Sequence, residues 1–175
     1  PSNVRTLHFP FAEVSTGASL EIFHAAHGRV DDYSPIRTFA PCTIHGKPSL
    51  LAGFVCTPLV RFDLADVESG QKVKGTTVAE LGNRNQPLDM IVYKQGDKDY
   101  LLLANSARGV MKISTDDIER QEGIGERISG TAGQKYDTIE DLKGVVQLDK
   151  LNDKHAVILV QTDSGNQDLR TIELP

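Results

Sequence analysis

Four residues in the N-terminal third of the chain have the types and spacing of a zinc site. His24 and His27 are separated by two residues, and so are Cys42 and His45. Two such pairs of imidazole and thiolate ligands are typical of zinc centres. However, residues 36–43 favour a single strand, which rises ~3.3 Å per residue and would hold the two pairs ~20–25 Å apart. This strand therefore argues against a four-ligand site.

A second candidate set joins the two histidines to an acidic loop and to the other cysteine. His24 and His27 with Asp31, and with Cys56 from a later loop, could ligate a metal ion or hold a cofactor. The alternative is that the histidines only form hydrogen bonds within a turn. If strand alternation continues through residues 22–26, the two imidazoles point to opposite faces, which disfavours a shared ion.

Other cofactor motifs are missing from the sequence. The chain lacks the Cys-x-x-Cys-His motif of covalently attached c-type haem. It also lacks the nucleophile-elbow, P-loop and dinucleotide-binding patterns. These motifs therefore identify no cofactor, and the histidines leave a metal ion or another bound cofactor open.

Three arginines fall in predicted loops that share one face of the fold. Arg29, Arg84 and Arg108, with Asn105 beside them, are expected to form a rim that binds an anionic small molecule. Guanidinium groups suit this role because they bind carboxylate or phosphate through two parallel hydrogen bonds. The alternative is that the arginines pair with nearby aspartates.

The two cysteines are not expected to form a disulfide. A hairpin turn near Gly46 places Cys42 opposite residues near Ser49, whereas Cys56 lies at the far end of the returning strand. Bridged Cα atoms must lie within ~7 Å of each other. Each cysteine is expected to be a semi-buried thiol that packs as a small apolar side chain.

An internal repeat determines where these loops lie. Residues 49–64 align without a gap with residues 100–115, and residues 9–20 align with residues 62–73. A weaker third copy begins near Gly144 and runs to the C-terminus. Several matches in the same register are typical of a repeat architecture.

The best-defined unit predicts short strands separated by turns. Residues 87–94, 100–106 and 109–115 are rich in apolar and β-branched residues, with QGDKD and SARG between them. A more polar fourth strand is expected to follow, as in residues 72–81 of the preceding unit. Four antiparallel strands per ~40–50 residues are typical of a β-propeller blade. A β-sandwich is the alternative, although its consecutive units need not resemble one another.

The predicted fold is all-β, with β-propeller blades of four antiparallel strands in an incomplete ring. Residues 1–34 would form the outer strands of a first partial blade, 35–86 and 87–139 two blades, and 140–175 a partial blade, all in one propeller domain. Closed propellers have four or more blades. We therefore expect an oligomer, completed by further propeller blades from another chain or a symmetry mate.

Residues 87–115 resemble the blades of YVTN/NHL-type β-propeller repeat proteins. In those blades a proline follows a Gly/Asn-rich loop, a Gly-Asp turn comes next, and the following strand ends in Ala-Asn, as it does here. The resemblance implies an architecture and no particular activity, since relatives include scaffolds, lactonases and dehydrogenase subunits. It also implies a periplasmic or extracellular location, with which the absence of an initiator Met agrees.

The composition excludes several classes of protein. The 175 residues include 24 Asp and Glu against 19 Lys and Arg, so the chain lacks the concentrated basic surface that binds nucleic acid. No apolar stretch approaches the ~20 residues of a membrane span. Apolar residues are spread along the chain, which excludes disorder.

These observations predict a binding or scaffold module in a larger assembly. The alternative is an enzyme, namely a propeller subunit of a secreted oxidoreductase or of a metal-dependent hydrolase. Its site would then lie around His24, His27 and the arginine rim.

Overall fold

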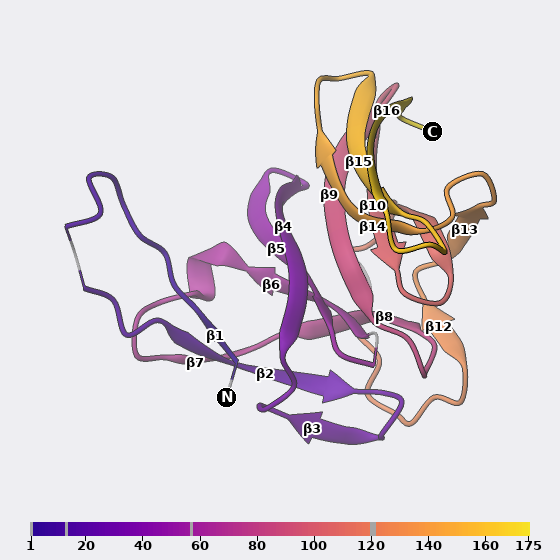
Figure 1. The fold of residues 1–175 in the computed structure, drawn as a ribbon. Coiled ribbons are helices and arrows are strands. Elements are labelled where there is room, and N and C mark those ends of the chain that lie inside the picture. Colours follow the sequence, from indigo (N-terminus) through magenta and orange to yellow (C-terminus); the bar gives the residue numbers. More distant parts are fainter. Residues whose placement is uncertain (1, 13, 57, 120–121) are drawn as a thin grey trace.

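The computed structural model describes residues 2–12, 14–56, 58–119 and 122–175. Within these ranges, sixteen strands build four sheets of three to five strands, and a short 3-10 helix, Leu64–Asp66, follows β6. None of the sheets closes on itself (Figure 1). The predicted all-β class is confirmed. Among the described residues there is no helix with the length and apolar character needed to cross a bilayer.

The first sheet has β2 at its centre. Its strands are β1 (Asn3–Val4), β2 (Ala18–His24), β3 (Arg29–Asp31) and β7 (Lys72–Lys74). β1 and β3 pair with β2 in the antiparallel sense, and β7 pairs with it in the parallel sense.

The parallel pairing of β7 corrects the prediction of one strand over residues 72–81. The chain breaks at Gly75, whose N–H donates to the carbonyl of Glu21 (2.8 Å). A Cβ at Gly75 would lie 2.4 Å from a methyl group of Val60 and 2.5 Å from the ring of Phe62. The backbone therefore passes against the hydrophobic core, and β7 and β8 join different sheets.

The second sheet contains five strands in the order β12–β8–β6–β5–β4. They are β4 (Ile36–Ile44), β5 (Lys47–Phe54), β6 (Pro58–Asp63), β8 (Thr76–Leu81) and β12 (Thr131–Gly133). The fifth strand was not predicted. It can approach β8 because Gly133 lacks a side chain: a Cβ there would lie 2.2 Å from the carbonyl oxygen of Val78.

The third and fourth sheets follow in chain order. The third has the order β13–β11–β10–β9, and the fourth has the order β14–β15–β16. Their strands are β9 (Pro87–Gln95), β10 (Lys98–Asn105), β11 (Gly109–Ser114), β13 (Tyr136–Ile139), β14 (Val145–Lys150), β15 (His155–Gln161) and β16 (Gln167–Glu173). The strands predicted over 87–94, 100–106 and 109–115 are confirmed to within two residues at each end.

The core lies between the sheets, which stack face to face. Along β10, Leu101 and Leu103 join an apolar cluster shared with the second sheet, whereas Leu102 and Ala104 join one shared with the fourth. This is the alternation expected of a strand that is covered on both faces. All four side chains are fully buried, so truncating Leu102 to alanine should cost about 2–5 kcal/mol of folding free energy.

Candidate functional site

His24 occupies the last inward-facing position of β2. Ala18, Leu20, Ile22 and His24 alternate with partly exposed residues, so strand periodicity places the imidazole in line with core side chains. His24 is only 3% exposed. A polar ring at this depth needs a partner for each of its nitrogens.

The turn after β2 brings His27 onto the same side as His24. The strand ends at His24, and Gly28 N–H donates to the carbonyls of His24 (2.8 Å) and Ala25 (3.1 Å). Such a single helical turn places residues three apart on one face. The two imidazoles meet edge to face with their centroids 4.4 Å apart. The premise that strand alternation continues through residues 22–26 is therefore wrong.

Cys56 reaches the two histidines from the turn between β5 and β6. One ligand atom from each of His24, His27 and Cys56 lies within 4.8 Å of the other two. Cys56 has a φ of +63°, a left-handed conformation that is costly for a residue with a side chain and that recurs at functional sites. His27 is exposed and Cys56 is half-buried, so the cluster opens to solvent on one side.

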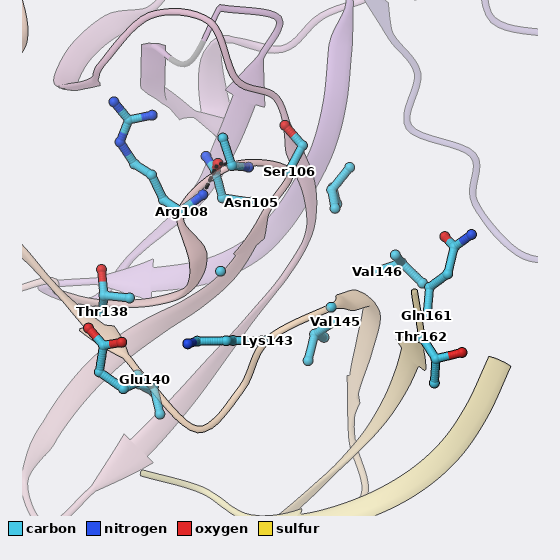
Figure 2. Close-up of a pocket in the computed structure, with 15 residues that line it drawn as sticks. Asn105, Ser106, Arg108, Thr138, Glu140, Lys143, Val145, Val146, Gln161 and Thr162 are labelled. Atoms are coloured by element: carbon cyan, nitrogen blue, oxygen red, sulfur yellow. Dashed lines mark hydrogen bonds between the residues drawn. The ribbon is translucent and has the colours of Figure 1, made fainter. Parts of the chain in front are cut away.

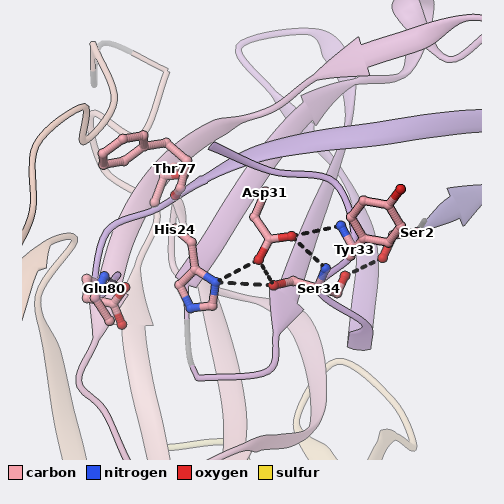
Figure 3. Close-up of polar contacts among 9 residues, drawn as sticks. Ser2, His24, Asp31, Tyr33, Ser34, Thr77 and Glu80 are labelled. Atoms are coloured by element: carbon pink, nitrogen blue, oxygen red, sulfur yellow. Dashed lines mark hydrogen bonds and ion pairs between the residues drawn. The ribbon is translucent and has the colours of Figure 1, made fainter. Parts of the chain in front are cut away.

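Asp31 and Ser34 hold the inner nitrogen of His24 (Figure 3). His24 Nδ1 lies 3.1 Å from Ser34 Oγ and 3.5 Å from Asp31 Oδ2. Partial burial acts to raise the pKa of Asp31, but hydrogen bonds donated by the Ser34 hydroxyl and the Tyr33 N–H lower it to about 2. Asp31 is therefore a carboxylate at neutral pH, and it orients the ring.

The outer nitrogen of His24 has no hydrogen-bond partner within the part of the chain that the structure describes. Burial, followed by repulsion from His27, lowers the pKa of His24, which favours the neutral ring. With Nδ1 hydrogen-bonded to Asp31, the lone pair is expected on Nε2. A buried, unpaired nitrogen beside a second imidazole and a thiol is a ready metal ligand.

Two polar side chains of β8 hold the end of β2 in place. Thr77 Oγ1 donates to the carbonyl of Phe23 (2.7 Å), and Glu80 Oε2 accepts from the N–H of Ala26 (3.2 Å). Glu80 is completely buried, and Figure 3 draws it together with Thr77 and His24. The turn that carries the histidines is thus attached to the second sheet.

Cys42 and His45, the other pair with the spacing of zinc ligands, lie elsewhere. Cys42 pairs with Ser49 in the β4–β5 hairpin, and His45 Nε2 lies 3.1 Å from a carboxylate oxygen of Glu119. The Cys56 turn is at the opposite end of β4, where Val55 N–H donates to the carbonyl of Pro35 (3.1 Å). The two pairs therefore lie at different ends of the sheet, and both cysteines are thiols.

Two of the four predicted anion-binding residues line one cavity. Asn105 and Arg108 line a common cavity, which Arg29 and Arg84 do not line. The amide of Asn105 is engaged internally: its Nδ2 donates to Asn85 Oδ1 (2.6 Å), and its Oδ1 accepts from the N–H of Arg108 (3.1 Å). Asn105 thus shapes a turn.

Sequence reasoning missed Ser34 and Glu80. Ser34 follows Asp31 by three residues in a loop, and its N–H donates to Asp31 Oδ1 (3.1 Å), an Asx-type turn that this spacing could have suggested. Glu80 carries no such signal, because it sits among buried residues of β8 like any core position.

Comparison of the chain with protein-family models, with curated proteins and with solved structures gives no match. The function is therefore inferred from the geometry of the site.

Proposed function

We propose that His24, His27 and Cys56 bind a single zinc ion at the surface of a propeller-type scaffold. One observation carries the proposal: the buried Nε2 of His24 has no hydrogen-bond partner among described residues, and one ligand atom from each of His24, His27 and Cys56 lies within 4.8 Å of the other two. Ligand atoms around tetrahedral zinc lie about 3.3–3.8 Å apart, so small side-chain rotations would complete the site.

The carboxylate that holds the other nitrogen of His24 supports the same assignment. Metal-bound histidines usually donate their other ring N–H to a carboxylate, which raises their basicity, and Asp31 occupies that position on His24. A thiolate at Cys56 and the carboxylate of Asp31 would balance the charge of a dication. Two imidazoles and a thiolate also suit copper, but the axial methionine typical of such sites is missing, since Met90 and Met111 are buried in another cluster.

Three protein ligands leave the fourth position of tetrahedral zinc open. Zinc with an open position binds water and lowers the pKa of that water to about 7. Because His27 is exposed, this position would face solvent. The proposed activity is accordingly that of a metal-dependent hydrolase, in which Asp31 and Ser34 act as positioning residues.

The scaffold is proposed to be a set of propeller blades, with boundaries near residues 35, 87 and 140. Support comes from the stacking of successive sheets in chain order through the apolar clusters between them. The resemblance of residues 87–115 to YVTN/NHL-type blades agrees with this arrangement.

A second candidate function is assembly with further blades, from another chain or a second copy of this one. In the second and third sheets, a further strand pairs with the third strand of the hairpin series: β8 pairs with β6, and β13 pairs with β11. In the fourth sheet, β16 has no such neighbour among the described residues. Six of its seven residues are exposed. An edge of this kind favours pairing with another strand.

Titration with Co²⁺, followed by displacement with Zn²⁺, tests the zinc site. Tetrahedral Co²⁺ with a thiolate ligand gives visible bands and a charge-transfer band, and we expect one ion per chain. Cys56→Ser should weaken binding more than about 100-fold and remove the charge-transfer band, and Asp31→Asn should weaken binding about 10–100-fold with that band retained.

The chain supplies its own matched control. Cys42→Ser and His45→Ala change the same residue types in the other pair, and we expect them to leave Co²⁺ binding intact. The proposal is overturned if variants of Cys42 and His45 lose as much Co²⁺ binding as Cys56→Ser does, or if the folded parent protein binds no Co²⁺.

A further inference from the structure

A cavity that none of the proposed zinc ligands lines lies between the third and fourth sheets. It has a volume of about 590 Å³ and opens among three chain segments (Figure 2). These are the β10–β11 turn, the connection from β13 to β14, and the end of β15. The lining also includes Leu88 of β9, and it contains Ala107, Ile139, Lys143 and Val145 from the first two segments or the strand ends beside them. A volume of several hundred Å³ is typical of small-molecule sites.

Hydrogen bonds hold the walls of this cavity in place. Asn105 Oδ1 accepts from the N–H groups of Ala107 (3.0 Å) and Arg108 (3.1 Å), which closes the β10–β11 turn. On the other wall, Gln161 N–H donates to the carbonyl of Gly144 (2.8 Å). Gly144 has a φ of +73°, and a Cβ there would lie 2.5 Å from the Gln161 carbonyl oxygen. The cavity is therefore largely preformed.

The floor of the cavity is apolar, and the charged residues that line it are Arg108, Lys143 and Glu140. Leu88, Ile139 and Val145 belong to the cluster between the third and fourth sheets, so the floor is the open end of a hydrophobic core. Lys143 extends across the cavity, with Glu140 beyond its ammonium end and the Arg108 guanidinium directed away from it (Figure 2). Lys143 makes no ion pair with any residue in the described ranges.

We propose that this cavity binds a small organic carboxylate. The apolar body of the ligand would lie on Leu88, Ile139 and Val145, and its carboxylate would pair with the ammonium group of Lys143. An apolar floor with one unpaired cation at the rim suits this class of ligand because burial supplies affinity and the charge fixes orientation. The site does not depend on the zinc ligands.

Benzoate tests this proposal, with benzyl alcohol as an uncharged probe of similar shape. We expect benzoate to shift the backbone amide signals of Ala107, Gly109 and Gly144 in two-dimensional NMR spectra, with a dissociation constant on the order of 1 mM. Benzyl alcohol should bind at least about fivefold more weakly, because it cannot form a charge-assisted bond to Lys143.

Variants distinguish binding of benzoate in the cavity from nonspecific binding at the protein surface. Lys143→Gln should weaken benzoate binding to the level of benzyl alcohol, whereas Lys135→Gln, which removes an exposed lysine outside the cavity, should have no effect. Ala107→Trp should fill the space and abolish binding of both probes. The proposal is overturned if benzoate shifts no cavity signal, if the two probes bind equally, or if Lys143→Gln, with an otherwise unchanged spectrum, binds benzoate as the parent does.

Discussion

At the scale of single residues, the two cysteines differ in their surroundings. Cys42 is half-buried in β4, and burial, followed by repulsion from Asp99, raises its pKa to about 11. Cys56 is also half-buried, but it lies in the turn between β5 and β6, among the proposed zinc ligands. Because the thiolate is the reactive form, the two side chains should respond differently to alkylation.

We expect iodoacetamide to modify Cys56 and to spare Cys42. Near pH 8, a thiol with a pKa of about 11 is ionised to about one part in a thousand. Zinc should protect Cys56, since a coordinated sulfur is a poor nucleophile. Peptide mass spectrometry after timed alkylation measures both sites, and equal modification rates, or a Cys56 rate indifferent to zinc, would contradict the assignment.

The lowered pKa of His24 predicts a pH dependence of stability. The folded ring resists protonation, whereas the unfolded ring takes up a proton near its ordinary pKa of 6.5. The unfolded state therefore binds more protons as the pH falls below about 6.5, and the metal-free protein loses stability there, with a slope of at most about 1.4 kcal/mol per pH unit.

Replacement of the His24 imidazole should reduce this dependence of stability on pH. In His24→Gln, measured by urea unfolding with a chelator present, stability between about pH 6.5 and 5 should vary less with pH than in the parent. Asp31 remains ionised across this window because its pKa is about 2. Identical slopes in the two proteins would show that the His24 ring protonates as freely when folded as when unfolded.

At the scale of elements, the turn that follows β2 makes the site. Gly28 has a φ of +65°, and a Cβ there would lie 2.7 Å from Cβ of Arg127. Gly46 in the β4–β5 turn has a similar φ of +78°, but no atom lies within 4 Å of its added Cβ. The two glycines therefore share a backbone requirement and differ in their surroundings.

Alanine at these two positions should separate stability from zinc binding. Each substitution puts a side chain in the left-handed region, at a cost of about 1–2 kcal/mol. Gly28→Ala should also displace the turn and weaken zinc binding by His27, whereas Gly46→Ala should not. Thermal unfolding and zinc titration of both variants measure the two effects, and equal zinc affinities would argue against a role for this turn.

Local patterns predicted the elements whose pairing is local. The strands β9, β10 and β11 are consecutive hairpin partners with apolar runs between turn residues, so their positions follow from nearby sequence. The division of residues 72–81 and the addition of β12 depend instead on contacts with β2 and β8, which are distant in sequence. No local pattern encodes such pairings.

The site was predictable to a similar extent. Alternation along β2 identifies His24 as an inward-facing position, and the sequence did place His24, His27, Asp31 and Cys56 in one candidate set. Local sequence could not predict that the two imidazoles lie on the same side, because this depends on where β2 ends. The approach of Cys56 to the histidines depends on how the first two sheets pack. Asp31 binds the ring of His24 and is not among the three clustered ligands.

At the scale of the whole molecule, the outer face of the fourth sheet differs from the faces between sheets. Leu159 and Leu169 are cross-strand partners on β15 and β16, on the face opposite the buried side chains Ala156, Ile158 and Val160. Leu169 is 74% exposed. An apolar sheet face with this exposure favours a further layer, which in the proposed scaffold would be the next blade.

Charge on this face should therefore prevent assembly without unfolding the chain. We expect the parent protein to form oligomers or to bind a second chain, and the double variant Leu159→Glu/Leu169→Glu to give a folded 19.1 kDa monomer in native mass spectrometry. Leu151→Glu, at a similarly exposed leucine outside the strands (54% exposed), should leave the assembly unchanged. A parent that is itself a monomer, or a double variant that still assembles, would mean that the fourth sheet is not an interface, and the proposal of further blades packed against it would then fail.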